Sequence, residues 1–135
     1  MKFDVSELEG GHLDLAVARI EVADTQGMSL VRIGDCWVVQ DQVAKKARFL
    51  IPSGTEPSAA AKMMFHGMPV FAPTAKWEHG GPIIEREGIN LSKRDGEWTA
   101  TAFRPEGLVV GTGSTALIAV MRAFVAVKLG DEIDL

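Results

Sequence analysis

The chain has 135 residues, 47% of them hydrophobic, and its 14 Lys and Arg against 18 Asp and Glu give a net charge of −4. This length predicts a single domain over residues 1–135. The content of Leu, Ile, Val and Phe excludes a globally disordered chain. The acidic balance argues against a protein that binds nucleic acid through its phosphates.

The single cysteine, Cys36, cannot form an internal disulfide, and its apolar neighbours favour a small core residue over a nucleophile. The first residues lack the pattern of a secretory signal. The longest apolar stretch, residues 116–129, is shorter than the about 20 residues needed to cross a bilayer. We therefore expect a cytoplasmic protein without a membrane contact.

The N-terminal part of the chain predicts a strand, a helix and a β-hairpin. Residues 1–6 alternate between polar and apolar side chains, as in a short strand. The apolar spacing of residues 10–23 predicts a helix with its N-cap at Glu9. Residues 28–33 and 36–40 are two β-like runs, which favour a hairpin or a bulged strand.

The middle of the chain is rich in turn signals. Residues 49–51 form a short apolar run that suits one strand, and residues 52–58 have the composition of a loop. Ser58 then suits the N-cap of a short helix over residues 59–66. Proline at the first position of residues 82–87, with Gly88 behind them, predicts a single helical turn.

The C-terminal part predicts a hairpin and a long helix. Asp95-Gly96 stands between two alternating runs and predicts a β-hairpin over residues 89–103. Residues 116–129 predict a helix that Ser114 or Thr115 caps. This helix is apolar on nearly all sides, so it should be buried on several of them.

We therefore expect an α+β fold in which a mostly antiparallel sheet carries the N-terminal and C-terminal helices, with the C-terminal helix central. Residues 131–135 form either an acidic tail or a last short strand. One small sheet face would hardly cover an all-round apolar helix. Packing against a second copy, as a homodimer, is therefore an alternative.

The segment Gly111-Thr112-Gly113-Ser114-Thr115 follows an apolar run and opens the last helix. A glycine-rich loop before a helix N-terminus is the geometry that binds phosphate, which makes Thr112, Ser114 and Thr115 candidate ligand contacts. The loop lacks the Lys-Ser/Thr of a P-loop and the third glycine of a dinucleotide fingerprint. We therefore favour the simpler interpretation, a glycine turn followed by an N-cap.

Trp77, Glu85, Arg86 and Glu87 form the second candidate cluster. Two carboxylates can divide acid and base roles, and an exposed Trp can anchor a partner. A buried charge needs a partner, however, and Arg122 lies inside the apolar helix. We therefore favour a structural ion pair between Glu85 or Glu87 and Arg122. The three histidines lack the spacing of metal ligands, so we expect neither a metal nor a cofactor.

Three blocks of the sequence resemble the NinX-like phage and prophage family, a family of unknown function. They are residues 1–20, the core Gly80-Gly81-Pro82-Ile83-Ile84-Glu85-Arg86-Glu87, and residues 115–132. The resemblance implies an intracellular protein made during a phage or prophage programme. It brings no catalytic residue, cofactor or substrate.

These observations favour a small phage accessory protein that is not an enzyme and that binds a host or phage protein. The alternative is a binder of a small molecule or nucleotide, or a weak enzyme, with a site near residues 77–88 and 111–115. That alternative requires the two segments to meet around one cleft.

Overall fold

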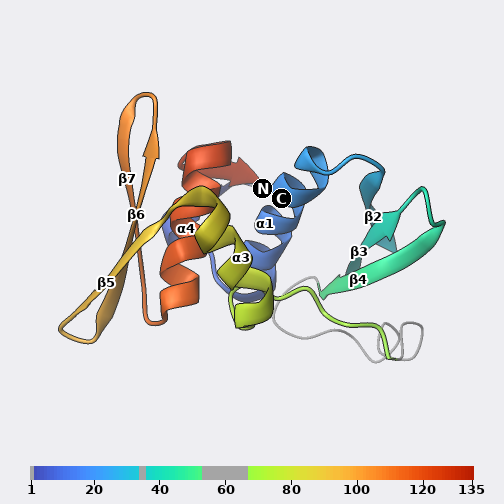
Figure 1. The fold of residues 1–135 in the computed structure, drawn as a ribbon, viewed down its shortest axis with the longest axis horizontal. Coiled ribbons are helices and arrows are strands. Elements are labelled where there is room, and N and C mark those ends of the chain that lie inside the picture. The colour runs from blue at the N-terminus through green and yellow to red at the C-terminus, as the bar shows by residue number, and fades with distance from the viewer. Residues whose placement is uncertain (1, 34–35, 53–66) are drawn as a thin grey trace.

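The computed structural model describes residues 2–33, 36–52 and 67–135 (Figure 1). Helices separate two runs of three strands along the described chain. In chain order they are β1 (Lys2–Asp4), the 3-10 turn η1 (Val5–Glu7), α1 (Gly10–Asp24), β2 (Met28–Ile33), β3 (Cys36–Asp41), β4 (Lys46–Pro52), α3 (Trp77–Glu87), β5 (Asn90–Arg94), β6 (Glu97–Arg104), β7 (Gly107–Gly113), α4 (Ala116–Leu129) and β8 (Glu132–Asp134).

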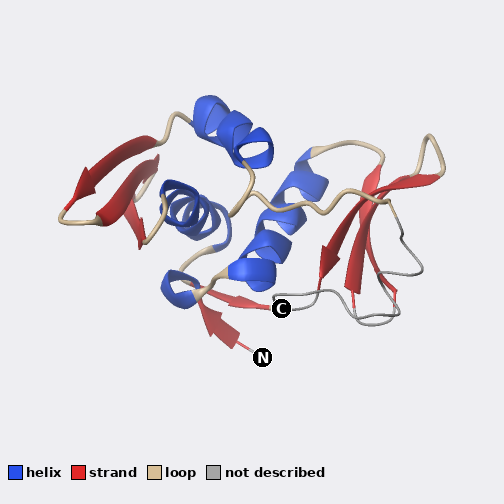
Figure 2. Cartoon of the chain, turned by 90° about the horizontal axis from the view of Figure 1, so that it is seen from below, coloured by secondary structure: helices blue, strands red, loops and turns tan. Residues whose placement is uncertain are grey.

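The described strands form three antiparallel sheets, with the orders β1-β8, β2-β3-β4 and β5-β6-β7. The two three-stranded sheets lie at opposite ends of the molecule, and the helices lie between them (Figure 1). The predicted α+β class is confirmed, although the strands divide into separate sheets. Figure 2 shows β1 and β8 side by side near both chain ends, so the last residues form a strand, one of the two predicted alternatives.

Helix α4 is the central element, as its sequence predicts. Nine of its residues are buried, and it packs against α1, α3, η1, β6 and β7. The close approach of β7 to this helix depends on two glycines. A Cβ on Gly111 would lie 2.4 Å from the main-chain oxygen of Ala119, and a Cβ on Gly113 would lie 2.8 Å from Ile118 Cγ2. The strand and the helix therefore touch at backbone distance.

The predicted glycine-rich loop is wrong, because Gly111 and Gly113 belong to β7. Glycine disfavours strands, but here the contact with α4 leaves no room for a side chain. The predicted cap is confirmed. The hydroxyl oxygen of Thr115 accepts a hydrogen bond from the Ile118 amide at 3.2 Å.

Helix α3 is longer than the single turn predicted, and Pro82 lies inside it. The two glycines at positions 80 and 81 weaken the local helix signal, but tertiary packing outweighs it. A Cβ on Gly80 would lie 2.6 Å from Leu117 Cδ2 of α4, and Ile83 is buried. The helix ends at Gly88, as predicted, with a left-handed backbone.

The predicted hairpins are confirmed. Strands β5 and β6 are joined through Asp95 and Gly96, which both have positive φ, as a tight Asp-Gly turn requires. Strands β2 and β3 pair antiparallel. Strand β4 extends beyond the predicted run of residues 49–51. Pro52, the first residue of the predicted loop over residues 52–58, belongs to β4 instead. The rest of that loop and the predicted helix over residues 59–66 lie outside the described residues.

Candidate functional site

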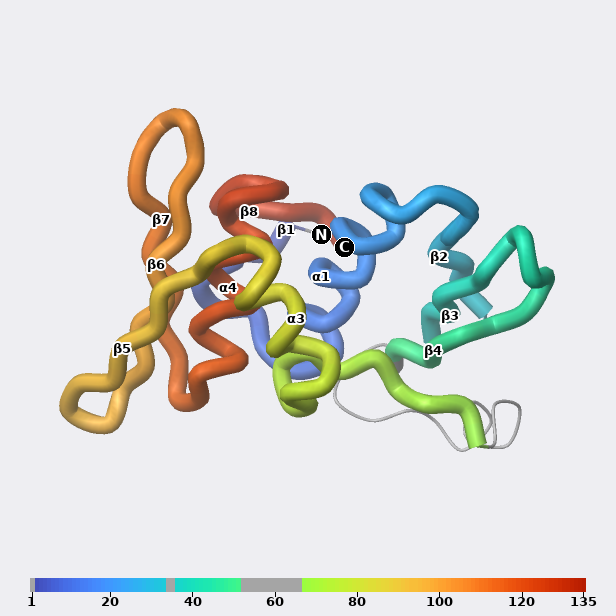
Figure 3. The backbone as a smooth tube through the Cα atoms, viewed as in Figure 1, coloured from blue at the N-terminus to red at the C-terminus, as the bar shows by residue number. Residues whose placement is uncertain are grey.

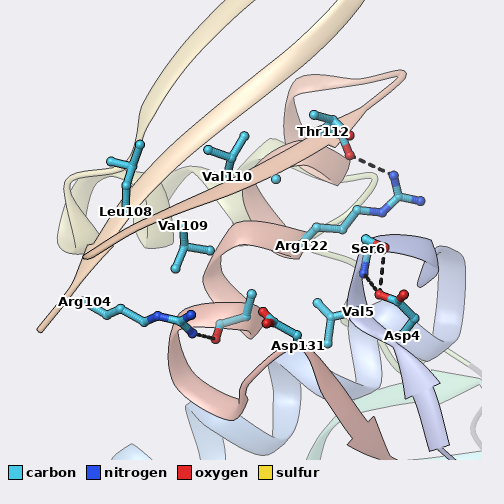
Figure 4. Close-up of a pocket in the computed structure, with 12 residues that line it drawn as sticks. Asp4, Val5, Ser6, Arg104, Leu108, Val109, Val110, Thr112, Arg122 and Asp131 are labelled. Atoms are coloured by element: carbon cyan, nitrogen blue, oxygen red, sulfur yellow. Dashed lines mark hydrogen bonds between the residues drawn. The ribbon is translucent and has the colours of Figure 1, made fainter. Parts of the chain in front are cut away.

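A groove runs along the free edge of β7. Its volume is about 400 Å³, within the usual range of ligand clefts. Strand β7 forms one wall, η1 and Asp131, which lies between α4 and β8, form the other, and α4 forms the floor (Figure 4). The side chains that line it include Asp4, Ser6, Arg104, Leu108, Arg122 and Asp131.

Arg122 ties the two walls of this groove together. Its Nε donates to the main-chain oxygen of Leu8 at 2.9 Å. Its Nη1 donates to the main-chain oxygen of Thr112 at 2.8 Å, as Figure 4 shows. The predicted ion pair of Arg122 with Glu85 or Glu87 is therefore wrong. The charge inside the apolar helix is satisfied by carbonyl oxygens, because Arg122 points toward η1 and β7 rather than toward α3.

The main chain of β7 turns alternate residues toward the groove. In an antiparallel ladder, both backbone groups of a residue point to the same side, and the side alternates along the strand. The carbonyl oxygen of Thr112 points away from β6, since it accepts from Arg122. The amide and carbonyl groups of Leu108 and Val110 therefore also face the groove. In the described chain they form no backbone hydrogen bond outside the ladder.

The other charged groups of the groove are held in place by local contacts. Arg104 donates through Nη1 to the main-chain oxygen of Ala126 at 3.3 Å, and its Nε lies 3.7 Å from Glu106 Oε2. Asp4 accepts from both the hydroxyl and the amide of Ser6, which lowers the pKa of its carboxyl group. The groove thus carries two guanidinium groups and two carboxyl groups.

The sheet face beside the groove is apolar and open to solvent. Phe103 and Leu108 form a cross-strand pair on β6 and β7, with exposed fractions of 66% and 56%. Val110, two residues further along β7, is 54% exposed. These three side chains form what we call the β7 patch. It lies on the opposite face of the sheet from α4, because the buried residues Ala102, Val109 and Gly111 alternate with it.

The second predicted cluster lies on α3 and is mainly a structural ion-pair network. The Arg86 guanidinium donates hydrogen bonds to the carboxylates of Glu21 on α1 and of Glu87, and these bonds raise the pKa of Arg86. Burial alone would raise the pKa of Glu87, but its bonds with Arg86 and with Lys128 of α4 outweigh burial and lower it. Glu85 points to solvent, and Trp77 is 58% exposed at the start of the helix.

The predicted site residues therefore do not converge on one cleft. Thr112 lines the groove, whereas no residue of 77–88 does. Ser114 is exposed, and the hydroxyl of Thr115 is used by the helix cap. The two segments contact different faces of α4, since Gly80 approaches Leu117 and Gly111 approaches Ala119. The shared site near residues 77–88 and 111–115 is a prediction that the geometry overturns.

Sequence reasoning missed the groove and the β7 patch. The signal lay in the alternation of β7, where Gly111 and Gly113 occupy every second position and Leu108, Val110 and Thr112 lie between them. Such a pattern indicates a strand with one face against a helix backbone and the other free. Because Gly111 and Gly113 were interpreted as part of a loop, this alternation was not recognised as that of a strand.

The described residues contain no cluster of three or more His, Cys, Asp or Glu side chains arranged to hold a metal ion. Among these residues, no helix combines the length and apolar character that a membrane crossing needs.

Comparison with known proteins assigns the chain to a family. No curated protein matches the sequence. The family model described as "Bacteriophage P22, NinX" matches residues 4–128, which is most of the chain and includes β7 and nearly all of α4. The chain therefore belongs to the NinX family of phage proteins.

Proposed function

We propose that this NinX-family chain is a non-catalytic accessory protein that binds another protein, encoded by the phage or by its host. The observation that carries the proposal is the β7 patch. Single exposed apolar side chains are ordinary on protein surfaces. Adjacent ones on one face of a sheet are typical of a surface that another protein covers.

The composition of the β7 patch supports the same interpretation. Phe103 is aromatic, and aromatic residues are enriched in protein–protein interfaces. The groove beside the patch supplies charged groups, so an apolar centre has a polar rim, as such interfaces usually have. Trp77 is also exposed but lies on α3, and its role as a partner anchor stays a prediction.

Site-specific photocrosslinking tests the proposal. The photoreactive amino acid p-benzoylphenylalanine replaces Phe103 in one variant and Val43 in the control. Val43 is a matched control because it is apolar, 83% exposed, and in the turn between β3 and β4 at the other end of the molecule. Both variants are made in phage-infected cells and irradiated.

We expect one defined protein to be crosslinked at position 103 and not at position 43. The substitution Val110→Asp, placed beside the probe, should abolish that adduct, because it puts a charge in the apolar contact. Identical adducts at both positions, or none at position 103, would contradict the proposal.

A further inference from the structure

The free edge of β7 is unusual because nothing in its sequence protects it. Edge strands normally carry charged residues, proline or bulges, which prevent another strand from adding to them. Strand β5, at the opposite edge of the same sheet, ends in Lys93 and Arg94. Strand β7 has the sequence Gly-Leu-Val-Val-Gly-Thr-Gly, without a charge or a proline.

At Leu50, the molecule pairs the comparable edge of its other large sheet with its own chain. There, the Leu50 amide donates to the main-chain oxygen of Pro69 at 3.0 Å, and the Phe71 amide donates to the main-chain oxygen of Leu50 at 3.0 Å. Figure 3 shows this segment running beside β4 on its way to α3. Along β7, the groove occupies the corresponding position.

From these observations we infer that the groove receives an extended, amphipathic segment of the partner protein, which adds to β7 as a fourth strand of the sheet β5-β6-β7. This inference rests on the proposed function and specifies its mode. Leu108 and Val110 direct their amide and carbonyl groups into the groove, so they supply the two residues of β7 that such a strand would pair with.

The two faces of the added strand would meet different surroundings. On the outer face its side chains would lie beside Leu108 and Val110, so apolar residues suit those positions. On the inner face they would point into the groove, whose charged lining residues are Arg104, Arg122, Asp4 and Asp131. Polar or charged residues suit those positions. The expected segment therefore alternates between apolar and polar residues.

The shape of the groove favours a single strand over the edge of a second copy of this protein. The 3-10 turn η1 and Asp131 stand opposite β7 and close the far side of the groove (Figure 4). A strand that adds to β7 lies about 4.8 Å from it. A continuous sheet from a second copy would have to extend through that wall.

Selection from a random 12-residue peptide library displayed on phage tests this inference with defined probes. Selected peptides are synthesised, and their affinity is measured for the unmodified protein and for two matched variants. Val110→Pro removes the main-chain donor that faces the groove without removing a bond to β6. Val110→Thr keeps that donor and the β-branched shape.

We expect the selected peptides to alternate between apolar and polar residues, and to bind Val110→Pro at least roughly tenfold more weakly than Val110→Thr, as the loss of main-chain bonding implies. Circular dichroism verifies the fold of both variants. Should Val110→Pro fail to fold, N-methylation of the peptide replaces it. Methyl groups on one set of alternate amides should abolish binding, and methyl groups on the other set should not.

Selection of no peptide, or of peptides that bind both variants equally, would overturn the inference. So would equal tolerance of both N-methylated peptides, or a dimer of the protein held through β7. A crosslinked partner at position 103 together with any of these results would leave the proposed function standing and remove strand addition alone. Loss of both the crosslink and the peptides would remove both.

Discussion

The two three-stranded sheets of this protein are alike in topology and different in how they are packed. Sheet β2-β3-β4 meets α1 through side chains, among them Leu15, Val39 and Ile51. Sheet β5-β6-β7 meets α4 at backbone distance through Gly111 and Gly113. The first has its β4 edge paired at Leu50 by the chain itself, whereas the second has its β7 edge beside a groove. The comparison contrasts an edge that the chain pairs with itself and an edge that it leaves open.

The largest expected effect comes from placing the same side chain in both sheets. Gly111→Val puts a Cβ within 2.4 Å of the Ala119 oxygen and should cost more than about 4 kcal/mol or prevent folding. Ile51→Val removes one methylene from a fully buried position and should cost only about 1 kcal/mol. Urea unfolding measures both. An equal loss in the free energy of unfolding for both variants would contradict the backbone contact between β7 and α4.

Arg122→Met tests how the end of β7 is held over the groove. It removes the donors to the Leu8 and Thr112 oxygens and should cost about 2 kcal/mol. The exposed Arg94→Met is the control and should change stability by less than about 0.5 kcal/mol. In a double-mutant cycle with Glu87→Gln, the Arg122 effect should be additive. A large coupling energy between the two substitutions would indicate an ion pair between Arg122 and Glu87, which the geometry excludes.

Asp14→Asn tests how the segment that covers β4 is held. The buried Asp14 carboxyl accepts from the Thr74 amide at 3.0 Å, and burial raises its pKa to about 6 from 3.8. Because the folded pKa is the higher one, its contribution to stability is fully present below pH 3.8 and is lost as pH rises through 6. Asparagine keeps an acceptor without the charge, so it should stabilise the protein at pH 7.5 by about 2 kcal/mol.

Thermal unfolding of both proteins from pH 3.5 to 7.5 checks this prediction. The difference between Asp14→Asn and the unmodified protein should grow as pH rises through about 6. A difference that does not depend on pH, or an asparagine variant less stable at pH 7.5, would contradict it.

The smallest effect is expected for the pair Arg86–Glu21, which joins α3 to α1 between the two sheets. The side chains are partly exposed, so solvent screens the pair, and a double-mutant cycle should give about 0.5 kcal/mol of coupling. Raising the salt concentration should reduce it further. A coupling of several kcal/mol would contradict this prediction, because an exposed ion pair does not stabilise a protein to that extent.

Predictions from local signals were reliable. Asp95-Gly96 predicted its hairpin, the pair Ser114-Thr115 contained the cap residue, Thr115, and the run of apolar residues in α4 predicted its burial. Each of these features depends on neighbours in the chain. The length of α3, the strand conformation of Gly111 and the partners of Arg122 were missed. Each of these depends on a surface of α4 or η1 that is remote in sequence.

The candidate site was harder to predict than the fold for the same reason. Thr112 was identified, but as a phosphate contact in a loop rather than as an edge-strand residue bonded to Arg122. Asp4 and Arg104 lie far apart in the sequence and line the same groove only because the tertiary fold brings the N-terminal residues close to β7. No spacing in the sequence encodes that arrangement.

Native-state amide hydrogen exchange of the free protein tests the central claim, the open edge of β7, most directly. We predict fast exchange at Leu108 and Val110, slow exchange at their neighbours Val109 and Gly111, whose amides face β6, and slow exchange at Leu50 and Phe71 on the covered edge of β4. Slow exchange at Leu108 and Val110 in the free protein would mean that this edge is already paired, and would contradict the account.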